Sequence, residues 1–169
     1  MKSIQGIANS AFLGFFGSHI FATLVVDSQA ILPKSLIPGS LQDLLSWYVK
    51  LFNDPLMGQA KDLLWFQSLV ALELTFQLPF FVWACSELYN TKPEQKSYSR
   101  SFQYACLIYG GHASTSMVPI LSTLMTNPKA SGSEKAMIVS LYLPYLLFPA
   151  GLLWFATKSP DADNEKKSS

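Results

Sequence analysis

Four long stretches of this sequence carry almost no charged side chains, and they constrain the fold more than any other feature. Residues 3–26, 63–86, 101–128 and 136–157 contain no Lys, Arg or Asp and a single Glu, at Glu73. Each stretch is long enough for a membrane-spanning helix, which needs about 20 apolar residues. None shows the strict alternation of a membrane-spanning strand. The sequence therefore predicts an all-α membrane protein, a bundle of four transmembrane helices with spans near 8–32, 63–86, 101–126 and 136–157.

The overall composition excludes several other classes of protein. Only 14% of the 169 residues are charged, whereas soluble domains average about 25%. The net charge of +1 provides no basic field for nucleic acid, and the 50% apolar content excludes a disordered chain. Cys85 and Cys106 fall within predicted spans, so we expect no disulfide framework. The two Cys and two His lie in separate spans, so we expect no zinc site, and we expect no cofactor. We expect one membrane domain over residues 1–158, followed by a polar tail over 159–169.

The distribution of basic residues predicts how the chain is oriented in the membrane. With four spans, both termini lie on the same side. That side carries more basic residues than the other (Lys2, Lys92, Lys96, Arg100, Lys158, Lys166 and Lys167 against Lys34, Lys50, Lys61, Lys129 and Lys135). Because basic residues favour the cytoplasmic side, we expect cytoplasmic N- and C-termini.

The first predicted loop, residues 27–62, is much longer than the common helix connection of about 2–8 residues, and it is not polar. Residues 44–52 have the pattern of an amphipathic helix, bounded by Pro38-Gly39 and by an Asn-Asp-Pro turn at 53–55. This helix could lie at the membrane interface with Trp47-Tyr48 at the level of the lipid headgroups. It could equally fold back as a lid over the bundle.

Proline and glycine residues occur inside the predicted spans. The prolines are Pro79, Pro119, Pro144 and Pro149. Membrane helices tolerate proline because neighbouring groups satisfy the freed carbonyls. These prolines indicate kinked helices around a cavity, although proline is common in membrane helices generally. Gly110-Gly111 in the third span predicts a close approach between helices.

Glu73 is the most informative polar residue. A charge near the bilayer midplane costs at least about 2.5–3.5 kcal/mol, so this side chain must face the bundle interior, be neutral or be paired. Gln77 follows one turn later on the same face, and His19, Thr23 and Asp27 share a face of the first span. We expect Asp27 and Glu73 to approach each other, with Glu73 protonated and Asp27 left as the anionic partner for a cation.

Polar side chains also occur at helical spacing in the last two spans. Tyr109, His112 and Ser116 share one face of the third span, and the fourth span adds Tyr142 and Tyr145. If these groups converge, they form a ligand pocket between the helices. The alternative is that they serve only hydrogen bonding between helices.

The polar residues above lie within short motifs that extend over most of the chain. These are Ser-His-Ile at 18–20, Asp-Ser-Gln-Ala-Ile-Leu-Pro at 27–33, Trp-Tyr at 47–48, Phe-Asn-Asp-Pro-Leu at 52–56, Glu-Leu-Thr-Phe-Gln-Leu-Pro-Phe-Phe at 73–81, Pro-Ile-Leu-Ser-Thr at 119–123 and Tyr-Leu-Pro-Tyr-Leu-Leu at 142–147. In order and spacing they resemble the sigma-2 receptor family, also called the transmembrane protein 97 family, within the EXPERA group.

This resemblance implies a four-helix protein of the endoplasmic-reticulum membrane, often a homodimer, with a lateral intramembrane pocket for sterols or lipophilic cationic amines. It implies a role in sterol handling or membrane-protein homeostasis. Asp27 would bridge to the ligand amine, Glu73 would hydrogen-bond to it in protonated form, and Asp54 would be structural. The implied pocket lining adds His19, Val26, Trp47, Tyr48, Gln77, Tyr109 and Tyr145, together with Ser116, where the family has threonine.

The end of the chain carries a feature that bears on location. Lys166 and Lys167 are the fourth and third residues from the C-terminus. They resemble the dilysine retrieval signal of the endoplasmic reticulum, which requires a cytoplasmic tail. A tail end that is merely basic is the alternative.

Two other functions are considered beside ligand binding. The EXPERA group includes sterol Δ8-Δ7 isomerases, and Glu73, Asp27 and the two histidines could shuttle a proton. However, Gln77 lies one turn after Glu73, and an amide donates no acidic proton, so we expect a binding protein rather than an enzyme. A purely structural partner protein, in which the pocket is incidental, is the third alternative.

Overall fold

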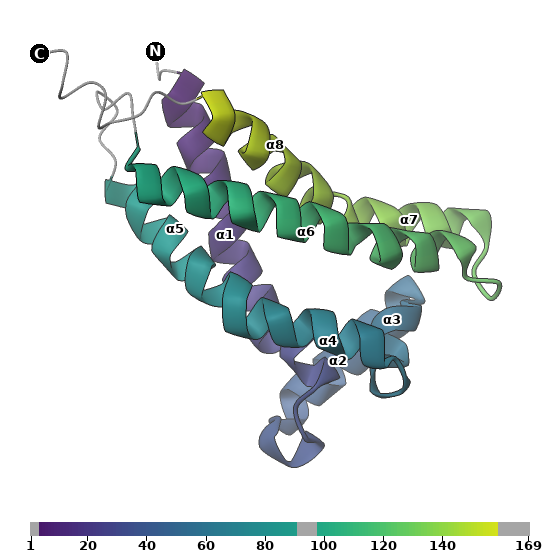
Figure 1. The fold of residues 1–169 in the computed structure, drawn as a ribbon. Helices are drawn as coiled ribbons and strands as arrows, with labels where there is room; N and C mark the ends of the chain where they lie inside the picture. The colour runs from purple at the N-terminus through teal and green to yellow at the C-terminus, as the bar shows by residue number, and fades with distance from the viewer. Residues whose placement is uncertain (1–3, 91–97, 159–169) are drawn as a thin grey trace, which may run out of the picture.

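The computed structural model describes residues 4–90 and 98–158, and every element in these two segments is a helix (Figure 1). The all-α fold class is therefore confirmed for this part of the chain. The predicted retrieval signal at Lys166 and Lys167 lies outside the described residues, as do the tail at 159–169 and the basic residues Lys2, Lys92 and Lys96.

The first long helix, α1 (Ile4–Val25), ends earlier than the sequence predicts. A 3-10 turn, η1 (Asp27–Ala30), follows it in place of the α-helix expected to continue to residue 32. The cause is local, because the Ser28 hydroxyl donates to Leu24 O at 2.8 Å and the Gln29 amide donates to Val25 O at 2.7 Å. Side chains that occupy these carbonyls compete with the backbone amides that would continue the helix.

The long first loop folds into a series of short helices. These are η2 (Lys34–Leu36), α2 (Gly39–Phe52), α3 (Pro55–Gly58) and η3 (Ala60–Asp62). The predicted amphipathic helix lies within α2, which ends at Asn53 in the left-handed conformation (φ 49°). Asp54 then begins α3, because its carboxylate accepts hydrogen bonds from the backbone amides of Leu56 and Met57.

The second apolar stretch contains a π-helical turn in its middle. α4 (Leu64–Leu72) leads into η4 (Glu73–Gln77), in which the Leu78 amide donates to Glu73 O five residues earlier, and α5 (Leu78–Asn90) follows. Pro79 comes directly after this turn. A proline ring in a regular α-helix clashes with the carbonyl four residues before it, and a widened turn relieves that crowding.

The last two apolar stretches fold as α6 (Arg100–Thr126), α7 (Gly132–Tyr142) and α8 (Pro144–Lys158). Ser131 and Glu134 form a capping box at the start of α7. Because Pro144 has no amide hydrogen, the predicted fourth span is divided into two helices at Leu143.

Within the described residues, 3 helical stretches are long and apolar enough to cross a membrane: Ala8–Ala30, Leu64–Asn90 and Gly132–Thr157. These stretches indicate a multi-pass membrane protein. The 27-residue helix α6 is also long enough, but it is less apolar, because it carries His112 and several Ser and Thr side chains. The predicted count of four spans therefore stays a prediction.

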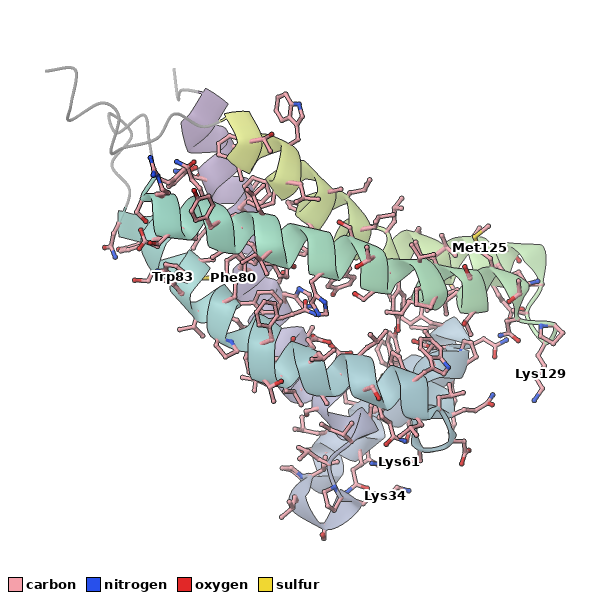
Figure 2. The ribbon with its side chains drawn as sticks, in the orientation of Figure 1. Lys34, Lys61, Phe80, Trp83, Met125 and Lys129 are labelled. Carbon is pink, nitrogen blue, oxygen red and sulfur yellow. The ribbon has the colours of Figure 1, made fainter. Side chains whose placement is uncertain are left out.

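The helices pack in two main pairs, α1 against α5 and α6 against α8 (Figure 1). One buried cluster is rich in aromatic side chains, among them Phe16, Phe81 and Tyr109, and lies toward the end where α1 begins and α8 ends. A second cluster, which includes Leu56 and Leu124, joins α2 and α3 to α6 and α7 at the other end. Figure 2 shows side chains filling the spaces between the ribbons at both ends.

Candidate functional site

A cavity of about 210 Å³ lies between the two clusters. Side chains from all the long helical stretches line it, together with residues from η1 and α2. The lining residues are His19, Ala22, Val26, Asp27, Tyr48, Phe66, Leu69, Val70, Glu73, Gln77, Tyr109, Ala113, Ser116, Met117, Ile120, Leu141, Tyr142 and Tyr145.

Glu73 is held in place by two side chains of α1. Its Oε1 atom accepts a hydrogen bond from the Thr23 hydroxyl at 2.5 Å and lies 3.3 Å from His19 Nε2. Thr23 is completely buried, and the Glu73 side chain is only 15% exposed. The spacing of four residues between His19 and Thr23 brings both to the same face of α1, so both side chains reach the same carboxylate oxygen.

Asp27 lies at the start of η1, one turn beyond Thr23. Its carboxyl and that of Glu73 line the same cavity and interact electrostatically. The cavity thus contains an acid pair that borders an apolar space.

Aromatic rings and unpartnered polar atoms form the wall beside the acid pair. The His19 ring stacks on Phe81 with centroids 4.5 Å apart and meets Tyr145 edge-on at 4.7 Å. His19 Nδ1 and the Tyr109 hydroxyl are buried and make no hydrogen bond to the described part of the chain. Such groups are costly to bury unpaired, at about 1–3 kcal/mol each, so they suit contact with a polar group of a ligand.

A hydrogen-bond network centred on Asp54 closes the end of the cavity near α2. Asp54 Oδ2 accepts from the hydroxyls of Tyr48 and Tyr142, each at 2.8 Å, while Oδ1 accepts from the amides of Leu56 and Met57 at 2.8 and 3.2 Å. Burial and the Asp54 charge raise the pKa of the Tyr48 phenol above its ordinary value of 10.0. This buried carboxylate thus joins α2, α3 and α7.

The cavity wall contains the predicted ligand contacts with one exception. His19, Val26, Asp27, Tyr48, Glu73, Gln77, Tyr109, Ser116 and Tyr145 all line it. Trp47 does not, and its side chain is 59% exposed. Successive residues of a helix point about 100° apart, so α2 cannot direct both Trp47 and Tyr48 inward. Trp47, which the family resemblance implies as pocket lining, therefore lies outside this cavity.

Thr23 and Tyr142 are named among the polar residues of the predicted spans, although neither is assigned a contact with the ligand. In the structure Tyr142 lines the cavity and donates a hydrogen bond to Asp54. Thr23 donates a hydrogen bond to Glu73. The apolar lining residues carry no distinguishing signal in the sequence, because apolar side chains fill every span.

The arrangement suits reversible binding of an amphiphile. The acid pair can accept a hydrogen bond from an ammonium or hydroxyl group, and the surrounding apolar and aromatic surface can pack against a hydrocarbon body. Among the residues that the structure describes, no group of three His, Cys, Asp or Glu side chains could hold a metal ion.

Residues 40–156 match the family described as EXPERA (EXPanded EBP superfamily). The chain is 40% identical to sigma intracellular receptor 2 of Homo sapiens over 164 residues, which cover 90% of this chain and 89% of the relative. The sigma intracellular receptor 2 of Xenopus tropicalis is 35% identical over 164 residues, with 92% and 91% covered. Efficient mitochondria targeting-associated protein 19 of Saccharomyces cerevisiae is 28% identical over 150 residues, with 83% and 92% covered.

Proposed function

The chain belongs to the EXPERA family, and from this premise we propose that it binds a sterol or a lipophilic amine within the membrane of the endoplasmic reticulum. Its role would be sterol handling or membrane-protein homeostasis. The relatives named sigma intracellular receptor 2 support a receptor rather than an enzyme.

The observation that carries this proposal is the acid pair of Asp27 and Glu73 in an otherwise mainly apolar cavity. Glu73 Oε1 accepts a hydrogen bond from Thr23 and lies 3.3 Å from His19 Nε2, and in this proposal the second oxygen of Glu73 carries a proton. Asp27 is then the carboxylate that meets the ammonium of an amine ligand. A charge-assisted hydrogen bond of this kind contributes about 1.5–3 kcal/mol, and the low local dielectric favours a paired cation over an unpaired acid.

The size of the cavity supports an amphiphile that is only partly enclosed. Its volume of about 210 Å³ is below the roughly 300–1,000 Å³ of sites that enclose drug-sized ligands. The polar end of a sterol or amine would occupy this space, while its hydrocarbon body would extend between the helices toward the lipid. A lateral opening in the membrane is the natural route for such a ligand.

The arrangement of the helices supports four spans, with α6 as the less apolar one. α6 packs along α8 within the bundle (Figure 1), as a membrane-spanning helix would. The start of α1 and the end of α8 lie at the same end of the bundle, as do the end of α5 and the start of α6. This topology fits an even number of crossings, with both termini on one side, and we propose that this side is cytoplasmic.

The direct test is ligand binding by the purified full-length protein and its Asp27→Asn variant. We expect this variant to bind a radiolabelled lipophilic amine about ten- to a hundredfold more weakly, because it loses a charge-assisted hydrogen bond. A neutral sterol should lose much less affinity, because an amide still hydrogen-bonds to a hydroxyl. Asp43→Asn is the matched control, since Asp43 is exposed on α2 and does not line the cavity. Equal amine affinity of Asp27→Asn and wild type would refute the anchoring role.

An isomerase is the second candidate, and one observation favours it. His19 Nε2 lies 3.3 Å from Glu73 Oε1. At this distance a proton could pass between the two side chains, one of which would exchange it with a bound sterol. Gln77 lines the same cavity and offers no acidic proton, which weighs against this chemistry. Rescue of a cell that lacks sterol Δ8-Δ7 isomerase by this chain, but not by its Glu73→Gln variant, would establish the enzyme and overturn the receptor.

A further inference from the structure

A second cavity, of about 300 Å³, lies beside α2. The η1–η2 segment, α2 and the α3–η3 segment surround it, and it shares no lining residue with the first cavity. Leu45, Val49 and Met57 form apolar parts of its wall, and Lys34 and Lys61 bring basic groups to it. This cavity is therefore amphipathic and carries positive charge.

The two lysines are arranged so that both ammonium groups remain available. Lys61 Nζ donates one hydrogen bond to Leu32 O at 2.9 Å, which fixes it close to the η2 segment that carries Lys34 (Figure 2). The Lys34 ammonium makes no hydrogen bond or ion pair with any residue in the described segments. Asp62 is the single acidic side chain of the lining, so the basic groups outnumber it. An ammonium has three donors, and Lys61 uses one.

The surface next to this cavity is suited to contact with lipid. Leu44, Trp47 and Leu51 follow one another at helical spacing on α2 and are 39%, 59% and 48% exposed. Leu36, two residues after Lys34 in η2, is 69% exposed. An exposed apolar stripe with tryptophan beside basic residues is typical of a helix that lies in the headgroup region of a bilayer. The second cavity would then lie at the depth of the lipid phosphates.

We propose that this second cavity binds the phosphate headgroup of an anionic membrane lipid. The phosphate lies between the ammonium groups of Lys34 and Lys61, which supply charge-assisted hydrogen bonds to its oxygens. The glycerol and the first methylenes of the acyl chains pack on Leu45, Val49 and Met57. Basic pockets between membrane helices bind anionic lipid headgroups, and with cytoplasmic termini this cavity faces the opposite, non-cytoplasmic leaflet. The site is independent of the amine or sterol site, and neither requires the other to be occupied.

Native mass spectrometry of the full-length protein in detergent tests this proposal, with phosphatidylinositol as the probe and phosphatidylcholine of the same acyl chains as the neutral comparison. Wild type should bind phosphatidylinositol in preference to phosphatidylcholine. The double variant Lys34→Gln/Lys61→Gln should weaken phosphatidylinositol binding by about tenfold or more. The matched control Lys129→Gln/Lys135→Gln removes the same charge at α7 and the turn before it, away from the cavity (Figure 2), and should stay within about twofold of wild type.

Two further variants separate lost binding from lost folding. Lys34→Gln alone leaves the Lys61 hydrogen bond to Leu32 intact and should still weaken binding. Asp62→Asn removes the acidic group from the lining and should strengthen it, which a misfolded protein would not do. Equal loss in the Lys129/Lys135 control, or no preference for the anionic lipid, would overturn the proposal. Lysine-dependent binding of soluble glycerophosphoinositol as tight as that of the lipid would overturn it as well, since the ligand would then be a free phosphate ester.

Discussion

α6 approaches α8 closely at Gly110, and replacement of this glycine tests how tightly these helices pack. A Cβ atom placed at Gly110 would lie 2.7 Å from Leu153 Cγ and 2.9 Å from the backbone oxygen of Pro149. Leu153 could move to another rotamer, whereas the carbonyl of Pro149 moves only with the α8 backbone. A Cβ atom placed at Gly111, the next residue, would have no such neighbour within 4 Å. The pair therefore offers a substitution and its control side by side.

The expected magnitudes follow from two opposing effects. Overpacking of a close contact typically costs about 1–3 kcal/mol. Replacing glycine by alanine inside a helix gains about 0.8–1.0 kcal/mol of helix propensity. For Gly110→Ala the two effects combine to a net loss between zero and about 2 kcal/mol. For Gly111→Ala only the gain remains, so the two variants should differ by about 1–3 kcal/mol in the free energy of unfolding.

Reversible unfolding of the two variants in the same mixed micelles measures this difference. Thermal denaturation followed by circular dichroism gives the same ordering as a shift in Tm. The reasoning would be refuted if Gly110→Ala were as stable as Gly111→Ala, because the α6–α8 contact would then accommodate a methyl group. Gly110→Val should widen the difference, since a branched side chain leaves less room than alanine.

Three further predictions concern the polar groups of the site. Asp54→Asn should lower the free energy of unfolding by about 2–4 kcal/mol, because two tyrosine hydroxyls lose a charged acceptor. The control Asp43→Asn, at an exposed position, should change it by less than about 0.5 kcal/mol. Equal effects of the two variants would contradict a stabilising role of the Asp54 hydrogen bonds. Thr23→Val removes the donor to Glu73 and should weaken amine binding about tenfold, whereas Thr23→Ser should restore it; equal affinities of the Val and Ser variants would exclude a role for the hydroxyl. Burial and Asp54 raise the pKa of Tyr48 above 10.0, so the stabilising contribution of this phenol is complete below about pH 10 and declines as the pH rises further. Tyr48→Phe should make the free energy of unfolding fall less steeply with pH in this range. An unchanged slope would exclude the contribution of Tyr48.

The sequence predicts the apolar helices well because hydropathy over about 20 residues is a strong signal. It predicts the approach of Asp27 and Glu73 for a similar reason, since a buried acid must find partners and the spacing of His19, Thr23 and Asp27 selects one face. Helix ends are harder to predict. The side chains of Ser28 and Gln29 end α1 through hydrogen bonds that no hydropathy pattern reveals.

Contacts between distant segments are the other part that the sequence could not provide. Asp54 reads as a turn residue, and the structure does use it as a cap. Its bond to Tyr142, 88 residues away, depends on how α7 packs against α2, which local spacing does not encode. Gly110-Gly111 predicts close helix packing as a pair, yet only Gly110 meets α8 closely. Which of two adjacent glycines faces a neighbour depends on the rotation of the whole helix.

The π-turn at Glu73–Gln77 amounts to one extra residue absorbed into a continuous helix. If this turn moved by one position, the residue that it passes would rotate by about 100° about the helix axis. Glu73 is the first residue of the turn, so such a shift would change the direction of its carboxyl relative to Asp27 and to Thr23. The position of the π-turn along the helix therefore decides whether Glu73 faces its partners in the cavity.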